Sequence, residues 1–163
     1  MNSAHIHLIV NHLPLFAALF GGGLLAFGMV GSQNALKRAG LVLGVVAGIG
    51  AIVAVQSGER AEDIVEAYSG VSEEAIHDHE ESAEAAQWAV VALGAISLLG
   101  LVIPTSRTRL RSASEWAALA LFVISMGFLA RAANLGGLIR HPEIEGPPPA
   151  AQVDSETEDD IEH

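Results

Sequence analysis

Most of the seven histidines of this chain lie close to the ends of long apolar segments. The opening stretch SAHIHLIVNHLPLFAALF places His5, His7 and His12 ahead of an apolar run, and AIHDHEESAEAAQWAVV repeats the arrangement with His77 and His79. A neutral imidazole binds haem iron and divalent metals, and it also exchanges protons near neutral pH. The spacing therefore indicates ligand chemistry where helices begin.

The absence of cysteine narrows that chemistry. It excludes thiolate-bound iron–sulfur clusters, covalently attached c-type haem and disulfides within the chain. No G-x-S-x-G or P-loop pattern occurs, so no hydrolase or nucleotide site is indicated. A metal or haem would have to be held by His, Met or carboxylate side chains.

Haem b suits such a chain because it fits between the helices of a bundle and needs only one or two axial side chains. We expect His12 and His79 to meet across the bundle as one axial pair. His7 and His141 would form a second pair nearer the surface, for one or two haems. Propionates would be neutralised by one of three arginines, Arg131, Arg140 or Arg60.

Two other interpretations stay open. The same four histidines could form a non-haem metal site with Glu59, Glu80 or Glu84, which would suit zinc, iron or manganese better than copper(I). The histidines could also serve no cofactor and hydrogen-bond lipid headgroups, water or one another.

The two histidines of the second cluster are predicted to face in different directions. Projected on a helix over 72–103, His79 falls on an apolar stripe with Ile76, Ala83 and Val90, whereas His77 falls among acidic side chains. His79 should therefore face the bundle interior and His77 should face water. Glu80 borders the interior stripe, where it could orient a ligand histidine through a hydrogen bond.

The elements that must position these residues are membrane helices. The chain is 51% hydrophobic and 17% charged, with a mean hydropathy of +0.43, which is ordinary for a small membrane protein. Its apolar segments predict four helices of a length that crosses a bilayer, over about 8–30, 39–56, 72–103 and 113–139. We expect an all-α, integral membrane four-helix bundle over 1–141, a short amphipathic outer helix over 59–69, and a disordered acidic tail over 142–163.

Several local signals refine these helices. Gly58 is expected to end the second helix, and Gly40, Gly44 and Gly48 form a small-residue stripe for helix packing or, alternatively, for a flat cofactor. Ser72 is expected to cap the third helix. The fourth helix would open with a capping box, formed by Ser112 and Glu115.

Charge predicts the orientation of the helices. Five of the eight basic residues lie in the loops after the first and third helices, which places those loops in the cytoplasm. Ten of the 19 acids lie in 59–84 and eight lie in 143–162, on the opposite side together with all seven histidines. We expect a bacterial cytoplasmic membrane protein with both termini on the outer, periplasmic side, where the acids would attract a basic partner such as a soluble cytochrome c.

Arg131 lies inside an apolar run near that outer side. A cation at this depth is costly unless it snorkels or is paired. Its expected partners are a haem propionate or one of three acids, Glu59, Glu62 or Glu80.

Three short motifs occur along the chain: the H-x4-H-x-P spacing of HLIVNHLP, the pair His79–Glu80, and GGLIRH at 136–141. In these motifs, over about residues 5–141, the chain resembles a bacterial family of four-helix membrane domains of unknown function. Relatives in that family are sometimes joined to Rieske or c-type cytochrome modules, which implies electron transfer near a membrane surface. The histidines that match the family pattern are His7, His12, His79 and His141.

These observations predict a membrane b-type cytochrome or haem-bearing subunit, an electron carrier rather than a stand-alone enzyme. The alternatives are a structural subunit of a larger membrane complex without a cofactor, and a non-haem metal-binding membrane protein.

Overall fold

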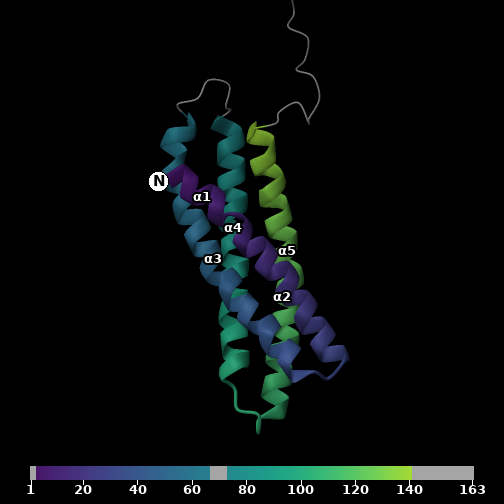
Figure 1. The fold of residues 1–163 in the computed structure, drawn as a ribbon. Coiled ribbons are helices and arrows are strands. Elements are labelled where there is room, and N and C mark those ends of the chain that lie inside the picture. The colour runs from purple at the N-terminus through teal and green to yellow at the C-terminus, as the bar shows by residue number, and fades with distance from the viewer. Residues whose placement is uncertain (1–2, 67–72, 141–163) are drawn as a thin grey trace, which may run out of the picture.

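The computed structural model describes residues 3–66 and 73–140, which contain helices joined by short turns and no strand. The elements in chain order are α1 (Ser3–Val10), α2 (His12–Val30), α3 (Asn34–Glu66), α4 (Glu73–Val102) and α5 (Thr108–Arg140). α1 and α2 follow one another along a roughly continuous line in Figure 1, and the one residue between them, Asn11, is a turn residue. The predicted all-α four-helix bundle is confirmed.

Four segments of these helices are long and apolar enough to cross a membrane. They are His7–Val30, Asn34–Arg60, Ile76–Val102 and Thr108–Leu138. Large apolar side chains point outward along them, and Phe27, Val30 and Val123 are 73%, 90% and 69% exposed. Such a surface is unfavourable in water, whereas lipid tails solvate it. The fold is therefore that of a multi-pass membrane protein.

Small residues bring the helix backbones together inside the bundle. A Cβ atom added to Gly40 would lie 2.6 Å from the carbonyl oxygen of Gly21, so α2 and α3 touch there through their backbones. A Cβ atom on Gly48 would lie 3.1 Å from the Cα atom of Gly94, where α3 crosses α4. The glycine stripe of α3 thus packs against neighbouring helices, as helix–helix packing in membranes favours.

Gly58 does not end a helix, and this prediction is wrong. α3 continues through Gly58 to Glu66 as one helix of 33 residues. A separate outer helix is therefore absent over 59–66, while 67–69 lies outside the described residues. Glycine in a helix costs only about 1 kcal/mol relative to alanine, and the position has another use that the next subsection describes.

The fourth helix begins earlier than expected, and the predicted capping box is wrong. α5 starts at Thr108, directly after a turn in which the Arg107 amide donates to the Pro104 carbonyl at 3.0 Å. Ser112 is therefore interior to the helix. Glu115 is 4% exposed and makes ion pairs instead of capping. The start of α4 at Glu73 agrees with the prediction, although Ser72 and the tail over 142–163 lie outside the described residues.

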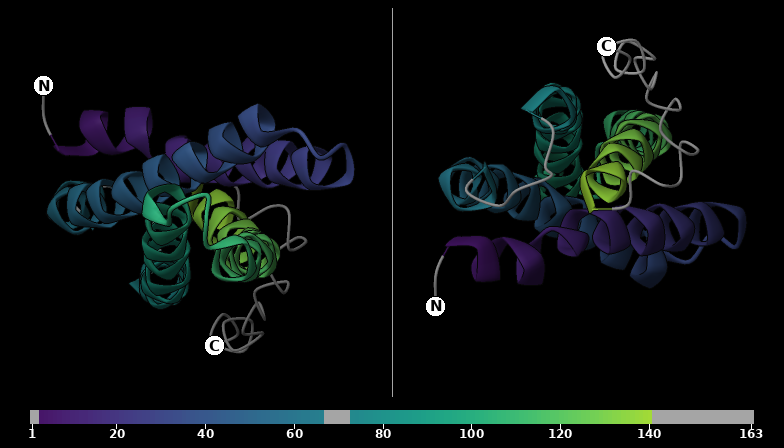
Figure 2. Two further views of the ribbon diagram at one scale, coloured as in Figure 1. Left: turned by 90° about the horizontal axis from the view of Figure 1, so that it is seen from below. Right: turned by 90° about the horizontal axis from the view of Figure 1, so that it is seen from above.

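Both hairpins of the bundle point the same way. The α2–α3 and α4–α5 connections lie at the lower end of Figure 1, while the beginnings of α1 and α4 lie toward the upper end. The two basic loops therefore share one end, as predicted. Seen along the bundle in Figure 2, α4 and α5 are nearly end-on and α2 and α3 lie across them, so the hairpins are inclined to one another.

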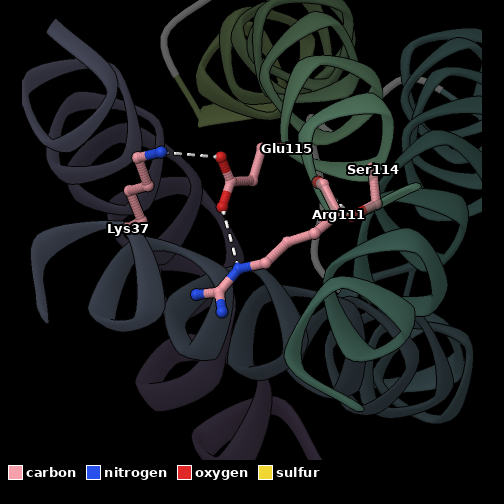
Figure 3. A network of polar contacts seen from close by, with 4 residues as sticks. All are labelled: Lys37, Arg111, Ser114 and Glu115. Carbon is pink, nitrogen blue, oxygen red and sulfur yellow. Dashed lines mark hydrogen bonds and ion pairs between the residues drawn. The ribbon is translucent and has the colours of Figure 1, made fainter. Parts of the chain in front are cut away.

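A buried carboxylate joins the hairpins at the lower end. Glu115 of α5 accepts from Lys37 Nζ of α3 at 2.9 Å and from Arg111 Nε at 3.2 Å (Figure 3). The Ser114 hydroxyl donates to the Arg111 carbonyl at 2.8 Å in the same turn. The carboxylate neutralises one of the two cations, so the three side chains together keep a net positive charge.

Candidate histidine site at one end of the bundle

His79 of α4 docks on α5. Its Nδ1 donates to the carbonyl oxygen of Ala132 at 2.9 Å, and its ring lies over Gly136, where an added Cβ would be 3.0 Å from Cε1. His79 is half-buried, whereas His77 on the same helix is exposed. The predicted difference in direction between these two histidines is confirmed.

His7 of α1 docks on α3 in the same manner. Its Nδ1 donates to the carbonyl oxygen of Ala54 at 3.0 Å, and its ring lies over Gly58, where an added Cβ would be 3.2 Å from Cε1. The Ser57 hydroxyl donates to the same carbonyl at 2.9 Å and lies 3.4 Å from His7 Nδ1. Gly58 is thus the surface on which His7 rests, which accounts for a glycine in the middle of a long helix.

These two hydrogen bonds fix the same tautomer in both rings. A carbonyl oxygen can only accept, so the hydrogen lies on Nδ1 and a neutral ring carries its lone pair on Nε2. Metal-bound histidines in proteins are held in this way, with the other ring nitrogen donating to a backbone carbonyl or a carboxylate. His7 and His79 share this tautomer and this kind of backbone hydrogen bond.

The structure brings His7, and not His12, to His79. The two rings lie close enough for a charge on His7 to act on His79. His12 is exposed; its ring stacks on Phe16 at a centroid distance of 6.2 Å, and its Nδ1 contacts the Asn11 Oδ1 atom. The expected pairing of His12 with His79 is not seen, because α2 turns that side chain away from the bundle. His141 lies outside the described residues.

Other donors near the two histidines are few. Within 3–66 and 73–140, no group of three or more His, Asp or Glu side chains converges as a metal site would require. Glu59 and Glu84 are exposed, and Glu80 is half-buried and already engaged in an interaction of its own. Ser82, one turn along α4 from His79, is 5% exposed, and its hydroxyl has no hydrogen-bond partner among the described residues. It is a buried donor available to a bound group.

The arginines at this end are exposed. Arg131 and Arg60 make no ion pair with a described residue, and the expected pairing of Arg131 with Glu59 or Glu80 is not seen. The side chains of Glu62 and Arg140 lie outside the described part of the chain. Among the side chains that the structure describes, the buried acid is Glu115, at the opposite end.

The residues on which the histidines rest were not predicted. Both sets have alanine followed by glycine four positions later, in AVQSG (54–58) and AANLG (132–136). Such small-residue spacing is common in membrane helices, so one copy does not indicate a contact with a histidine. The signal that could have indicated these contacts is the recurrence of the spacing near the same end of α3 and α5.

Comparisons with known proteins give no relative for this chain. No family model, no curated protein and no solved structure matches it.

Proposed function

We propose that the protein is a haem b-binding subunit of the bacterial cytoplasmic membrane that passes electrons at the outer face. The observation that supports this most directly is the matched pair His7 and His79. Each donates from Nδ1 to a backbone carbonyl and keeps Nε2 for a ligand. Two imidazoles from different helices, preset in this tautomer, are the protein contribution that a six-coordinate haem requires.

The small number of donors favours haem over a non-haem metal. Zinc, iron or manganese sites in proteins need three or four protein ligands, and the described residues offer no such group. A haem needs only one or two side chains from the protein, and His7 and His79 would supply two.

The surroundings also suit a flat apolar group. Gly58 and Gly136 let the imidazoles lie against helix backbones, and the Ser82 hydroxyl is a buried donor near His79. Arg131 and Arg60 are cations without an ionic partner among the described residues, so they can pair with propionates at the membrane surface. When bound, haem would supply reversible one-electron transfer. The chain itself would hold the iron through two nitrogens and exclude bulk water with its packed helices.

Charge sets the proposed orientation and partner. The end that carries Lys37, Arg111 and the basic loop of 103–107 would face the cytoplasm. The histidine end would face the periplasm with its exposed acids, including Glu74, Asp78 and Glu81. An acidic surface speeds the encounter with a basic redox partner such as a soluble cytochrome c.

Absorption spectroscopy of the purified protein tests the proposal. The oxidised and dithionite-reduced protein should show a Soret band and sharp α and β bands, from a haem that pyridine treatment extracts as haem b. His7→Ala and His79→Ala should abolish or greatly weaken these bands, while the matched controls His12→Ala and His77→Ala should retain them. A preparation from haem-supplied cells without a Soret band would reject the proposal and favour a structural subunit.

A further inference from the structure

The first helices of the two hairpins have the same pattern of burial. The same spacing of 72 positions separates His7 from His79 and Val30 from Val102, the last residues of α2 and α4. When each residue of α2 is matched with the residue 72 positions later in α4, five buried residues of α2 are matched with buried residues of α4. The pairs are Pro14 and Ala86, Ala18 and Val90, Gly21 and Leu93, Leu25 and Ser97, and Gly28 and Gly100.

The second helices agree at a different spacing. Lys37 and Glu115 are 78 positions apart, and the same spacing relates Ala54 to Ala132 and Gly58 to Gly136. Four of the nine described buried positions of α3 fall on buried positions of α5, and the other five fall on half-buried or exposed ones. The four pairs are Gly40 and Ala118, Gly44 and Phe122, Ala47 and Ser125, and Ala54 and Ala132. Each hairpin therefore holds its own histidine by the same two backbone features.

Equivalent residues form an ion pair at one end of the bundle and lie within electrostatic range of each other at the other end. Lys37 pairs with its own equivalent, Glu115, at 2.9 Å, and His7 lies near its own equivalent, His79. A residue meets its equivalent only close to a twofold axis, as in isologous dimers. Because both hairpins run in the same direction, such an axis lies along the bundle, from the histidine end to the ion-pair end.

The contact between α3 and α4 is not repeated by its equivalent, the contact between α5 and α2. α3 and α4 touch through Gly48 and Gly94, with Gly44 against Ser97. On the other side, the position of Gly44 is taken by Phe122, whose ring lies against Gly21 and Gly22 of α2. This ring and Met126, which stands where Gly48 would, line an apolar groove of about 290 Å³ between α2 and α5.

We infer that the bundle consists of two equivalent helical hairpins related by an approximate twofold axis, and that the outer site binds one ligand on this axis between His7 and His79. The inference rests on the proposed function for the identity of the ligand. His7 and His79, related in this way, would both hold a haem iron through Nε2. Gly58 and Gly136 are then equivalent positioning residues, each acting on the ligand through its own histidine.

Haem stoichiometry and coordination test the shared site. We expect one haem per chain in a six-coordinate, low-spin state. His7→Ala and His79→Ala should each remove the low-spin signal in electron paramagnetic resonance to the same extent. Gly58→Ala and Gly136→Ala should each weaken haem binding about tenfold, as loss of ligand orientation does elsewhere. Gly137→Ala is the matched control, because an added Cβ there meets no atom within 4 Å. Two haems per chain, or half of the low-spin signal remaining after loss of either histidine, would overturn the inference.

Nuclear magnetic resonance of the cofactor-free protein decides the inference even if no haem is bound. With ¹⁵N-labelled histidine, both the His7 and His79 rings should report hydrogen on Nδ1. Gly58→Ala should alter the His7 tautomer alone, Gly136→Ala the His79 tautomer alone, and Gly137→Ala neither. Different tautomers for the two rings, or insensitivity of either ring to its glycine, would show that the two hairpins do not position their histidines equivalently.

Discussion

Lys37 and Glu115 join the two hairpins through an ion pair of 2.9 Å in which the lysine side chain is 19% exposed and the carboxylate 5% exposed. Arg111 approaches the same carboxylate from one turn earlier in α5. Glu115 therefore pairs with two cations. Replacing each of the three residues should have a different effect on the free energy of unfolding.

Removal of the carboxylate should cost more stability than removal of the lysine. Glu115→Gln leaves Lys37 and Arg111 facing each other without an anion, and breaking a buried pair in this way costs about 3–5 kcal/mol. Lys37→Met leaves Glu115 paired with Arg111 and should cost clearly less. Reversible unfolding in mixed micelles measures both, and a double-mutant cycle gives the coupling. Equal losses for the two variants would show that Arg111 does not satisfy the carboxylate.

Glycines in contact with a backbone should not tolerate a methyl group. Gly40→Ala would place its Cβ 2.6 Å from the Gly21 carbonyl oxygen and 2.7 Å from the Leu25 amide nitrogen, so α2 and α3 must separate. We expect a large loss of thermal stability. Gly23→Ala is the matched control, because its Cβ meets no atom within 4 Å; it should be neutral or stabilising by up to about 1 kcal/mol. A destabilised Gly23→Ala would indicate a contact with another molecule at that face.

Arg131 should be replaceable without loss of stability in the cofactor-free protein. Its side chain is exposed and makes no ion pair with a described residue. An exposed arginine near a helix end can extend its charged group to the membrane surface. Arg131→Leu should therefore change the unfolding free energy by less than about 0.5 kcal/mol. A loss of several kcal/mol would reveal a buried acidic partner for this arginine.

Accessibility labelling checks the proposed orientation. Because the chain has no cysteine, Ser106→Cys and Asp78→Cys each introduce one unique thiol at an exposed position. In intact cells, a membrane-impermeant maleimide should label the thiol at 78 and spare the one at 106. After membrane disruption both should react. Labelling of position 106 alone from outside would reverse the proposed topology.

The acidic tail should speed the encounter with a basic cytochrome c. Truncation after Gly146 removes Asp154, Glu156 and four further acids while leaving the described helices intact. At low ionic strength electron exchange should slow, and its dependence on salt should weaken, since exposed charges act mainly on association rates. A variant that replaces these six acids by their amides separates charge from length. Identical rates with and without the tail would exclude it from the encounter.

The number of helices could be predicted because it depends on strong, long-range patterns. Apolar length defined the spans, the alternation of four spans put the two basic loops at one end, and the helical period separated His79 from His77. Gly58 was misread because intrinsic propensity describes a glycine only as a weak point, whereas the tertiary fold uses it as the surface beneath His7. The pairing of His12 failed because His7 and His12 are five positions apart, about 140° around a chain that stays helical at Asn11, so they point to different sides.

The internal equivalence is nearly invisible in the residues themselves. Equivalent positions carry Lys37 and Glu115, of opposite charge, and Gly44 and Phe122, of very different size. Position on an axis accounts for the first difference, since two lysines or two glutamates meeting there would repel. Several equivalent positions are both buried although their residues differ. Burial is known only from the structure, so the sequence alone does not show the equivalence.

The sequence positions of the partners of His7 and Lys37 have a consequence for biosynthesis. His7 finds its carbonyl and its glycine within the first hairpin, so that half can orient its imidazole as soon as it is in the membrane. Lys37, in contrast, must await a glutamate that the ribosome adds 78 residues later. The first hairpin would therefore leave the insertion machinery with its lysine unneutralised, and that cation would help to select the second hairpin as its partner.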